Sequence, residues 1–376
     1  MFIKLIILFF VFLFHINQAY SKTYISQVGP NLSYPWGVSK IDNENVLVTE
    51  KEGKLKTINT VTGKTTTIKN IPTVLYMSQG GLLDVFVENR NNNIYVFMCY
   101  SKPEGIFSSN TVLHKSILKN NALVDDEIIF STRRPLNESI HFGCRIAISQ
   151  DYIFLSLGDR GNRNNSQDIK NYEGSVVRIN FSGKKITKNQ FDTTWLNEVF
   201  SIGHRNPQGL IINPENNSIW SHEHGPQGGD EINLLEGGEN YGWPKVTHGE
   251  EYGGGKIGKL TQEGYKDPKW IWVPSIAPSG MAFYNGNMFP EEYRGDVFIA
   301  EHGSWNRTKK IGYRITRVKI DGNKSLGYEP FIYGWLEKDK NDAWGRPVDL
   351  VFLVDGSMLI SDDYANVIYR VTYDKG

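Results

Sequence analysis

Residues 38–50 read VSKIDNENVLVTE, and residues 55–58, which follow a turn at Gly53, read LKTI. Apolar residues on both sides of the Asp-Asn-Glu-Asn turn predict two antiparallel strands, and the LKTI segment predicts a third. The same succession of apolar strand, polar turn and second apolar strand recurs along the chain. Its five further copies begin near residues 84, 145, 209, 281 and 349. The sequence therefore repeats one small β unit six times.

The spacing of the six copies predicts the architecture. Successive copies lie about 45 to 70 residues apart, the length of a four-stranded propeller blade with an insertion. The 37 glycines and 15 prolines favour short strands and tight turns over long helices. We therefore expect an all-β chain, a six-bladed β-propeller of four-stranded antiparallel blades, with residues 22–376 as its single domain.

The last copy is too short to make a whole blade, since about 27 residues follow position 349. Propellers avoid an exposed sheet edge by completing the last blade from both ends of the chain, so we expect that closure here. Residues 152–157 and 296–300 are nearly continuous apolar runs. Because strands buried on both faces read this way, we expect these two to be inner strands around the channel.

The N-terminus carries a short apolar run at residues 5–14, preceded by one lysine and followed by small residues. The run is shorter than the roughly 20 residues that span a bilayer. It predicts a cleaved signal peptide over residues 1–21, a secreted or periplasmic protein and no stable membrane span after cleavage. The alternative is an uncleaved N-terminal anchor.

Cys99 and Cys144 are the two cysteines of the chain. An oxidising compartment would allow them to form a disulfide. Both lie inside strand-like runs, however, and one bridge cannot hold together a chain of this length. We therefore favour two buried free thiols.

The chain has 41 basic and 41 acidic residues, so its formal net charge is zero. The chain therefore lacks a long-range electrostatic field that would attract nucleic acid or anionic lipid. Binding is expected at local sites instead.

His141 lies at the entrance to a predicted strand, two residues before a glycine that allows close approach of a ligand. A histidine with a pKa near neutrality suits the role of general base. Asp159, at the far end of the same hairpin, could orient it. The alternative for Asp159 is a turn that only caps the strand.

Residues 203–209, GHRNPQG, place a cation and two amides between glycines. Simple turns rarely need so many donors. Arg205 and Asn206 would suit a planar, oxygen-rich anion.

Residues 221–231, SHEHGPQGGDE, allow two kinds of metal site. His222 and His224 share one face of a strand, but zinc needs three or four ligands and no third is evident. Alternatively, the backbone around Pro226 could present carbonyl oxygens to calcium, with the charges of Asp230 and Glu231 close by.

These segments together resemble a known family. HFGCR, LGDRG, GHRNPQGL, EHGPQGGDEIN, NYGWP, VPSIAPSG and GRPVD resemble the soluble aldose sugar dehydrogenases that depend on pyrroloquinoline quinone (PQQ), the glucose/sorbosone dehydrogenase family of six-bladed propellers. The resemblance covers roughly residues 30 to 373. It implies calcium-assisted oxidation of an aldose sugar at the anomeric C1, with hydride transfer to PQQ and a lactone as product.

The resemblance also implies a role for individual residues. His141 would be the base, Asp159 would hold it, and Arg205 would stabilise the reacting oxygen. Carbonyls of Gly225 and Pro226 would hold Ca²⁺. The residues expected around the PQQ are Gln79, Asn206, His224, Asp230, Ser275, Arg307 and Arg346.

Three departures from the family pattern affect these assignments. Cys144 replaces a small serine or glycine behind His141. The basic pair that holds the cofactor carboxylates is reduced to Arg346, because Val348 replaces its partner. The fifth-blade string AEHGSWNR, residues 300–307, resembles the sorbosone branch, so Arg307 is our choice for the basic contact, with Lys309 or Lys310 as alternatives.

Two other functions remain possible on this architecture, a calcium-dependent lactonase or hydrolase and a non-catalytic propeller that binds a glycan or partner. A metal hydrolase needs several converging carboxylates, whereas the inferred metal site is mainly carbonyl. The presence of His141, Asp159 and Arg205 together favours the dehydrogenase. No haem-attachment motif is present, so electrons must leave to a separate acceptor.

Overall fold

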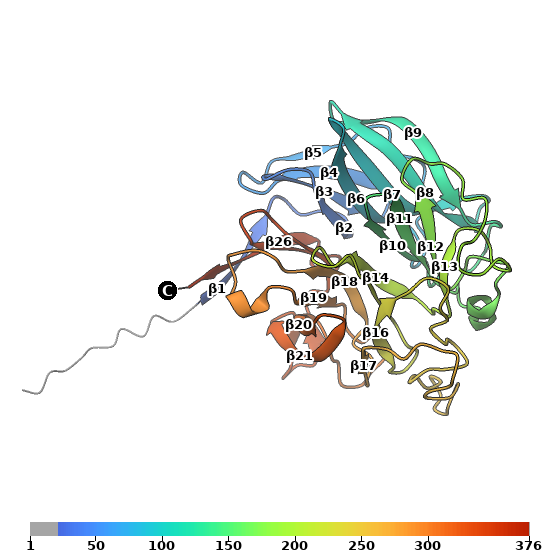
Figure 1. Cartoon of the computed structure of the whole chain (residues 1–376). Helices are drawn as coiled ribbons and strands as arrows, with labels where there is room; N and C mark the ends of the chain where they lie inside the picture. The colour runs from blue at the N-terminus through green and yellow to red at the C-terminus, as the bar shows by residue number, and fades with distance from the viewer. Residues whose placement is uncertain (1–21, 376) are drawn as a thin grey trace, which may run out of the picture.

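The computed structural model describes residues 22–375. These residues form six four-stranded antiparallel sheets around a common axis (Figure 1). The predicted six-bladed β-propeller is confirmed. The predicted signal peptide, residues 1–21, lies outside the described residues.

The first three blades follow the chain from the axis outward. Blade 1 contains β2 (Pro35–Lys40), β3 (Asn45–Glu50), β4 (Lys54–Asn59) and β5 (Thr65–Thr67). Blade 2 contains β6 (Leu82–Arg90), β7 (Asn93–Pro103), β8 (Ser109–Lys119) and β9 (Ala122–Ser131). Blade 3 contains β10 (Gly143–Ile148), β11 (Tyr152–Leu157), β12 (Ser175–Asn180) and β13 (Val199–Ile202).

The next two blades repeat this order. Blade 4 contains β14 (Pro207–Ile212), β15 (Ile219–Glu223), β16 (Asp230–Leu235) and β17 (Trp270–Trp272). Blade 5 contains β18 (Pro278–Phe283), β19 (Val297–Glu301), β20 (Arg314–Asp321) and β21 (Lys324–Ile332). A small hairpin, β22 (Leu336–Glu337) and β23 (Asp342–Ala343), and two 3₁₀ turns, η1 (Arg163–Gln167) and η2 (Glu291–Tyr293), lie in the connections.

Blade 6 is completed from both ends of the described chain. Its strands are β24 (Pro347–Phe352), β25 (Met358–Asp362), β26 (Val367–Asp374) and β1 (Lys22–Val28). β1 pairs with β26 in unbroken antiparallel register, from Lys22 opposite Asp374 to Val28 opposite Ile368. The expected closure is confirmed.

The first strand of each blade faces the axis. The apolar runs expected there, residues 152–157 and 296–300, correspond to β11 and β19, which are second strands, so that prediction is wrong. In β11, Ile153 packs in one cluster with Phe97 of blade 2, while Phe154 packs in another with Leu210 of blade 4. Apolar side chains on both faces therefore indicate a strand covered by two neighbouring blades.

Cys99 and Cys144 form a disulfide, so the expectation of two free thiols is wrong. Cys99 lies on β7 of blade 2 and Cys144 on β10 of blade 3, with their Cα atoms 5.6 Å apart in the core between the blades. Strand-like surroundings do not exclude a bridge when adjacent blades bring two buried strands face to face.

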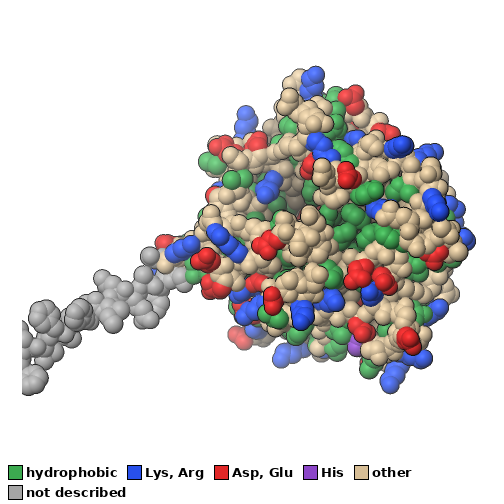
Figure 2. Space-filling view, viewed as in Figure 1, with side chains coloured by type: hydrophobic (Ala, Val, Ile, Leu, Met, Phe, Trp, Pro, Cys, Tyr) green, Lys and Arg blue, Asp and Glu red, His purple; other side chains and the backbone are tan. Residues whose placement is uncertain are grey.

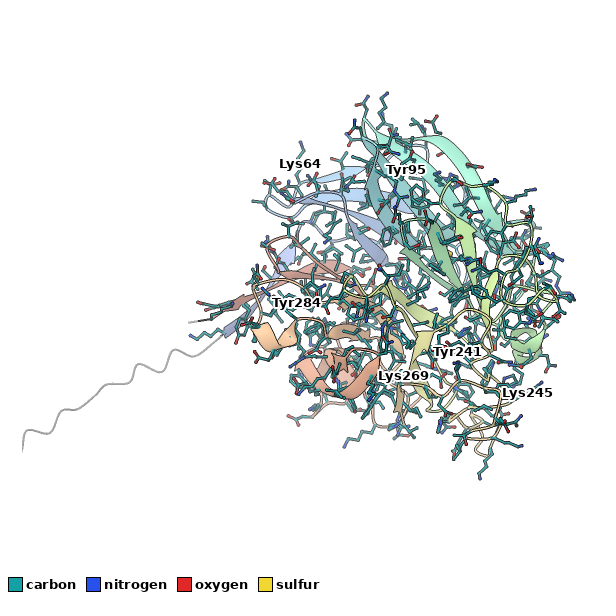
Figure 3. All side chains as sticks on the ribbon, in the orientation of Figure 1. Lys64, Tyr95, Tyr241, Lys245, Lys269 and Tyr284 are labelled. Carbon is teal, nitrogen blue, oxygen red and sulfur yellow. A yellow bond between two sulfur atoms is a disulfide. The ribbon has the colours of Figure 1, made fainter. Side chains whose placement is uncertain are left out.

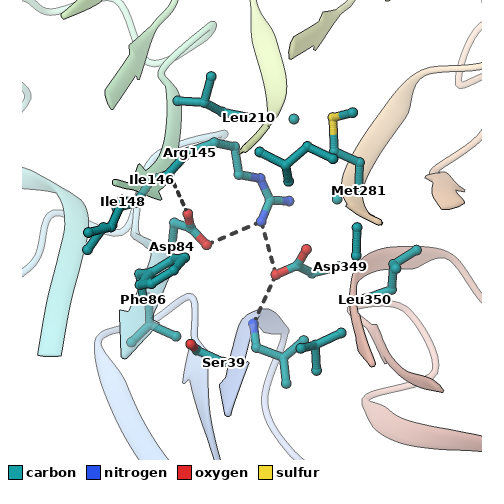
Figure 4. A pocket seen from close by; sticks show the side chains of 18 of the residues that line it. Ser39, Asp84, Phe86, Arg145, Ile146, Ile148, Leu210, Met281, Asp349 and Leu350 are labelled. Carbon is teal, nitrogen blue, oxygen red and sulfur yellow. Dashed lines mark hydrogen bonds and ion pairs between the residues drawn. The ribbon is translucent and has the colours of Figure 1, made fainter. Parts of the chain in front are cut away.

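A buried charge cluster crosses the axis. The Arg145 guanidinium lies 3.3 Å from Asp84 and 3.1 Å from Asp349 (Figure 4). Asp84 also accepts a hydrogen bond from the backbone of Ile146, and Asp349 accepts one from Val38. Burial raises the pKa of Asp84 to about 7, although the charge of Arg145 opposes this shift.

Arg145 also contacts the remaining blades. Its Nε donates to the carbonyl of Gln208 in blade 4, and its Nη2 donates to Ser279 in blade 5 and to the carbonyl of Val348 in blade 6. With the Asp84 and Asp349 contacts, one network joins all six blades. On its far side the channel is lined mainly by apolar side chains of the inner strands, such as Leu210 and Met281 (Figure 4).

The surface seen in Figure 2 intermixes acidic and basic side chains without a broad patch of one sign, as the balanced composition suggests. Lys64 and Lys245 are exposed on loops at the periphery (Figure 3). Within residues 22–375, helices of the length and apolarity needed to cross a membrane do not occur.

Candidate functional site

A polar cavity of about 410 Å³ opens at the mouth of the channel. Its walls are built from residues just before an inner strand or just after a second strand, because these positions of all six blades converge at one end of the ring. Nine of the twelve predicted site residues line it: Gln79, His141, Arg205, Asn206, His224, Gly225, Pro226, Ser275 and Arg346. Asp159, Asp230 and Arg307 do not.

His141 and Asp159 form the predicted pair. Nδ1 of His141 lies 2.7 Å from Oδ1 of Asp159, and the backbone N–H of His141 donates to Oε1 of Gln79 over 2.8 Å. Asp159 is buried behind the histidine, where it also accepts hydrogen bonds from the Trp243 indole and the backbone of Gly161. With Nδ1 donating to Asp159, Nε2 is the ring nitrogen that can accept a proton from a ligand.

The protonation of this pair follows from its surroundings. Burial lowers the pKa of His141 below 6.5, although its hydrogen bond to Asp159 opposes that shift. Burial acts to raise the pKa of Asp159, but the hydrogen bond from His141 helps hold it below the usual value. Near neutral pH the pair is therefore an imidazole held by a carboxylate, which is the form a general base needs.

Arg205 lies beside the proposed metal-binding segment. Its Nη1 donates to the carbonyls of His224 and Gly225, over 3.1 and 3.2 Å. Its backbone N–H donates to the buried carboxylate of Glu223, and its guanidinium lies 5.5 Å from the centre of the Trp243 ring. These contacts hold the positively charged side chain of Arg205 in the cavity wall.

Asn206 and His224 connect the neighbouring loops. Oδ1 of Asn206 accepts hydrogen bonds from the backbone of Gly143 and the side chain of Gln208. Nε2 of His224 lies 2.7 Å from the carbonyl of Pro278. Burial lowers the pKa of His224 to about 3, so its ring is neutral and Nε2 donates to that carbonyl.

Asp230 lies behind the cavity wall. Its carboxylate accepts hydrogen bonds from the Ser275 hydroxyl and from the backbone of Gly225, Ile276 and Ala277. Burial raises its pKa to about 6. Asp230 thus holds the Gly225 and Ser275 loops together from behind the wall, and it does not line the cavity in which the sequence predicts the cofactor.

The structure does not bring Arg307 into the site. This side chain is exposed and does not line the cavity. The alternatives, Lys309 and Lys310, line a different cleft. From this blade, His302 and Trp305 line the cavity instead.

Lys51 is a cavity residue that the sequence reasoning missed. Its ammonium group donates to the carbonyl of Ser78 over 3.0 Å and lies 4.6 Å from the centre of the Trp36 ring. Burial lowers its pKa to about 8. Lys51 directly follows β3, so the rule that residues after a second strand line the mouth would have found it.

Arg346 and His302 share one carboxylate in the same cavity. Arg346 donates to both oxygens of Asp363, over 2.8 and 2.6 Å, and Nε2 of His302 lies 3.2 Å from Oδ1 of Asp363. The carboxylate of Asp363 thus pairs with both Arg346 and His302. Lys51, in contrast, forms no ion pair with any carboxylate of the described residues.

The zinc alternative gains no support. His222 is buried away from the cavity that His224 lines. Within residues 22–375, no three His, Cys, Asp or Glu side chains gather in a way that could hold a metal ion.

Fold and cavity together define a class, a six-bladed propeller with a histidine–aspartate pair at the mouth of its channel. Residues 32–327 match the family described as Glucose / Sorbosone dehydrogenase. The chain belongs to this family and is an oxidoreductase of the sugar dehydrogenase type.

Two curated relatives illustrate the family. The chain is 34% identical over 282 residues to the aldose sugar dehydrogenase YliI of Escherichia coli, covering 71% of this chain and 75% of the relative. It is 26% identical over 255 residues to quinoprotein glucose dehydrogenase B of Acinetobacter calcoaceticus, covering 60% and 52%.

Solved structures agree with this assignment. A glucose dehydrogenase crystal structure superposes with a TM-score of 0.81 at 29% identity, covering 93% of this chain and 99% of the other. The apo-form of the soluble aldose sugar dehydrogenase from Escherichia coli superposes with a TM-score of 0.79 at 27% identity, covering 94% and 100%.

Proposed function

We propose that this protein oxidises aldose sugars at the anomeric C1 to lactones, using PQQ and Ca²⁺. The observation that carries the proposal is the His141–Asp159 pair, which opens into a cavity lined by Arg205, Arg346 and Lys51 in a member of this family. The quinoprotein among its relatives supports the choice of cofactor. Secretion, a single domain over residues 22–376 and a separate electron acceptor remain parts of the same proposal.

The residues present fit a planar tricarboxylate such as PQQ. A cavity of about 410 Å³ falls within the usual range for ligand pockets. Arg346 binds Asp363 and Arg205 binds two backbone carbonyls, and each guanidinium keeps further N–H donors for a ligand carboxylate. The ammonium group of Lys51 forms no ion pair with a carboxylate of the described residues, so its charge is available to a ligand. Gln79, Asn206, His224 and Ser275 would surround the ring system.

The segment around Gly225 fits a carbonyl site for calcium. A Cβ added at Gly225 would lie 2.0 Å from the carbonyl oxygen of Gly228, so only glycine allows this backbone path. A carbonyl oxygen has two lone pairs, so the Arg205 hydrogen bond does not prevent Gly225 from also binding a hard cation. Pro226 would supply the second carbonyl.

The chain itself handles the proton. Nε2 of His141 would accept the proton of the anomeric hydroxyl, and Asp159 would stabilise the imidazolium that results. Arg205 would hold the sugar oxygen as negative charge develops on it. The bound quinone would supply the oxidising power by accepting a hydride from C1, with calcium to polarise it.

Reconstitution tests the function. Purified residues 22–376 would be supplied with PQQ, Ca²⁺ or both, and reduction of an artificial electron acceptor would be followed with a panel of aldoses. Activity that needs both additions supports the dehydrogenase. A folded protein that neither binds PQQ nor reduces the dye contradicts it, and a lactone-hydrolysis assay then separates a hydrolase from a binding module.

Lys51→Met is expected to weaken PQQ binding by about ten- to a hundredfold, since a hydrogen bond to a charged group contributes about 1.5–3 kcal/mol. Lys51 would supply a second positive charge for the PQQ carboxylates, in place of the basic residue that Val348 replaces. The measurement is equilibrium titration of PQQ by fluorescence quenching, without sugar.

Two variants control this result. Lys51→Arg keeps the charge and should retain most of the affinity. Lys54→Met removes an exposed lysine of the same blade and should change nothing. Unaltered PQQ affinity in Lys51→Met would remove Lys51 from the cofactor site.

The pH profile should report the base. Because burial lowers the pKa of His141, the unprotonated ring persists below pH 6.5 and is lost as pH falls through the lowered value. The acid limb of kcat/KM should therefore have its midpoint below 6.5, measured across about pH 5 to 8. A midpoint above 6.5 would show that another group controls the reaction.

A further inference from the structure

A second cavity, which we call the outer cleft, lies between blades 4 and 5. One wall is β17, the outermost strand of blade 4, and the opposite wall includes Tyr328 of β21, the outermost strand of blade 5. Its volume of about 800 Å³ falls within the usual range for ligand pockets. None of the groups assigned above to cofactor, calcium or proton transfer lies in it.

Only a thin wall separates the outer cleft from the catalytic cavity. Ser275 and Ala277 line the catalytic cavity, whereas Ile276 between them lines the cleft. Gly303 of the cavity and Gly312 of the cleft pack so closely that a Cβ on Gly312 would lie 2.8 Å from the Cα atom of Gly303. Along residues 275–277 the wall is therefore a single stretch of chain.

Tyr313 closes this wall to ligands. Its buried side chain lines both spaces, and its hydroxyl donates to the carbonyl of Ser304 over 2.6 Å. A Cβ on Gly303 would lie 2.4 Å from the Tyr313 ring, so the ring is tightly packed. A sugar cannot pass from one space to the other. Electrons can, because they tunnel through a few ångströms of packed protein.

Aromatic rings form much of the outer cleft. Tyr328 meets Trp270 and Trp272 edge to face, with ring centres 5.6 and 5.9 Å apart. Tyr333, which also lines the cleft, is 58% exposed. Flat rings of this kind suit a planar aromatic ligand, which can stack on one ring and meet the edges of others.

Positive charge is in excess in the outer cleft. Lys309 and Lys338 are exposed there, and neither forms an ion pair with a carboxylate of residues 22–375. Lys310 donates to a backbone carbonyl, and Arg314 is paired with a buried glutamate. Asp339 is the only carboxylate among the described residues that line the cleft. The lining therefore attracts a negatively charged ligand.

We propose that the outer cleft binds the electron acceptor of this enzyme, and that this acceptor is a small, planar aromatic molecule with a negative charge. Its ring system would lie against Tyr328 and Tyr333, with the lysine side chains around its charged group. The inference rests on the proposed function, and it adds the place and the chemical class of the acceptor.

The electrons and protons balance without a bond to the chain. The acceptor would take two electrons from the reduced cofactor across the wall and two protons from water in the cleft. Two protons would leave the cofactor site through the mouth of the channel, and the cofactor would return to its oxidised form. Because sugar and acceptor occupy separate spaces, they should not compete with each other.

The double variant Lys309→Met/Lys338→Met tests the proposal. The probe is 2,6-dichlorophenolindophenol, a planar acceptor that is anionic at neutral pH. With the chain loaded with PQQ and Ca²⁺, the KM for this dye should rise about three- to tenfold, since each exposed lysine contributes a modest attraction. The KM for sugar, and the reduction of the cationic acceptor phenazine methosulfate, should stay unchanged.

Two further variants control the sign and the place of the effect. Asp339→Asn removes the negative charge from the cleft and should lower the KM for the anionic dye about two- to threefold. Lys54→Met/Lys324→Met removes two exposed lysines that do not line the cleft, and it should change nothing.

A binding measurement makes the test independent of turnover. Affinity for the dye would be measured by calorimetry without sugar, on the chain with and without PQQ and Ca²⁺, and Lys309→Met/Lys338→Met should weaken it in both forms. A normal KM for the dye in this variant overturns the inference, whether or not binding weakens. Competition between excess sugar and the dye also overturns it, because the dye would then enter the catalytic cavity. Failure of the loaded chain to reduce any acceptor would instead contradict the proposed function.

Discussion

We expect Arg145→Met to lower the free energy of unfolding by about 3–5 kcal/mol, because it leaves two buried carboxylates without the guanidinium group that pairs with them. Asp84 and Asp349 are both buried and each lies within 3.3 Å of the guanidinium. The methionine also removes the donors that reach blades 4, 5 and 6. The measurement is equilibrium denaturation in guanidinium chloride, with soluble yield recorded in case the variant does not fold.

The loss of stability in Arg145→Met should depend on pH in a defined direction. Without Arg145, burial holds the two carboxyl pKa values further above those of the unfolded chain. The folded variant then binds more protons than the unfolded one, so its stability falls as pH rises from about 4 towards 7. Arg163→Met, which breaks an exposed pair with Glu251, should cost less than about 1 kcal/mol. If both arginine variants lost equally little, the axial cluster would not stabilise the ring.

His141→Ala should lower kcat by about two to four orders of magnitude, the usual range for a positioned general base. Asp159 is buried behind His141 and does not line the cavity, so its carboxylate is not placed to take the proton of a bound sugar directly. Turnover would be measured by dye reduction with saturating PQQ, Ca²⁺ and sugar.

PQQ binding separates this effect from a loss of cofactor. The His141→Ala chain should bind PQQ with nearly normal affinity, because Arg205, Arg346 and Lys51 remain in the cavity wall. It should also lose the acid limb of the pH profile. Near-normal turnover in this variant would show that His141 is not the base.

Local pattern was enough to predict the ring, and the family resemblance supplied most of the site residues. The strand–turn–strand repeat identified the start of every blade, and positions next to those strands placed His141, Arg205 and His224 at one mouth. These predictions succeeded because a propeller repeats one local unit, so position within the unit fixes position in space.

Contacts between blades could not be read from local pattern. The Cys99–Cys144 disulfide and the Arg145 cluster each depend on which strands face one another across the ring. Arg307 was misplaced for a similar reason, since a loop of blade 5 decides whether it points into the cavity. Lys51 was missed because none of the segments that carry the family resemblance contains it.

The pairing of β1 with β26 has a consequence for the timing of folding. β1 cannot pair until β26 (Val367–Asp374) has been synthesised. At about 5–20 residues per second, a chain of 376 residues takes roughly 20–75 s to make. Blades 1 to 5 can form in order during that interval, but the ring can close only after β26 has been made. Until then both ends of the growing chain expose open strand edges, which is when binding by a chaperone would protect it most.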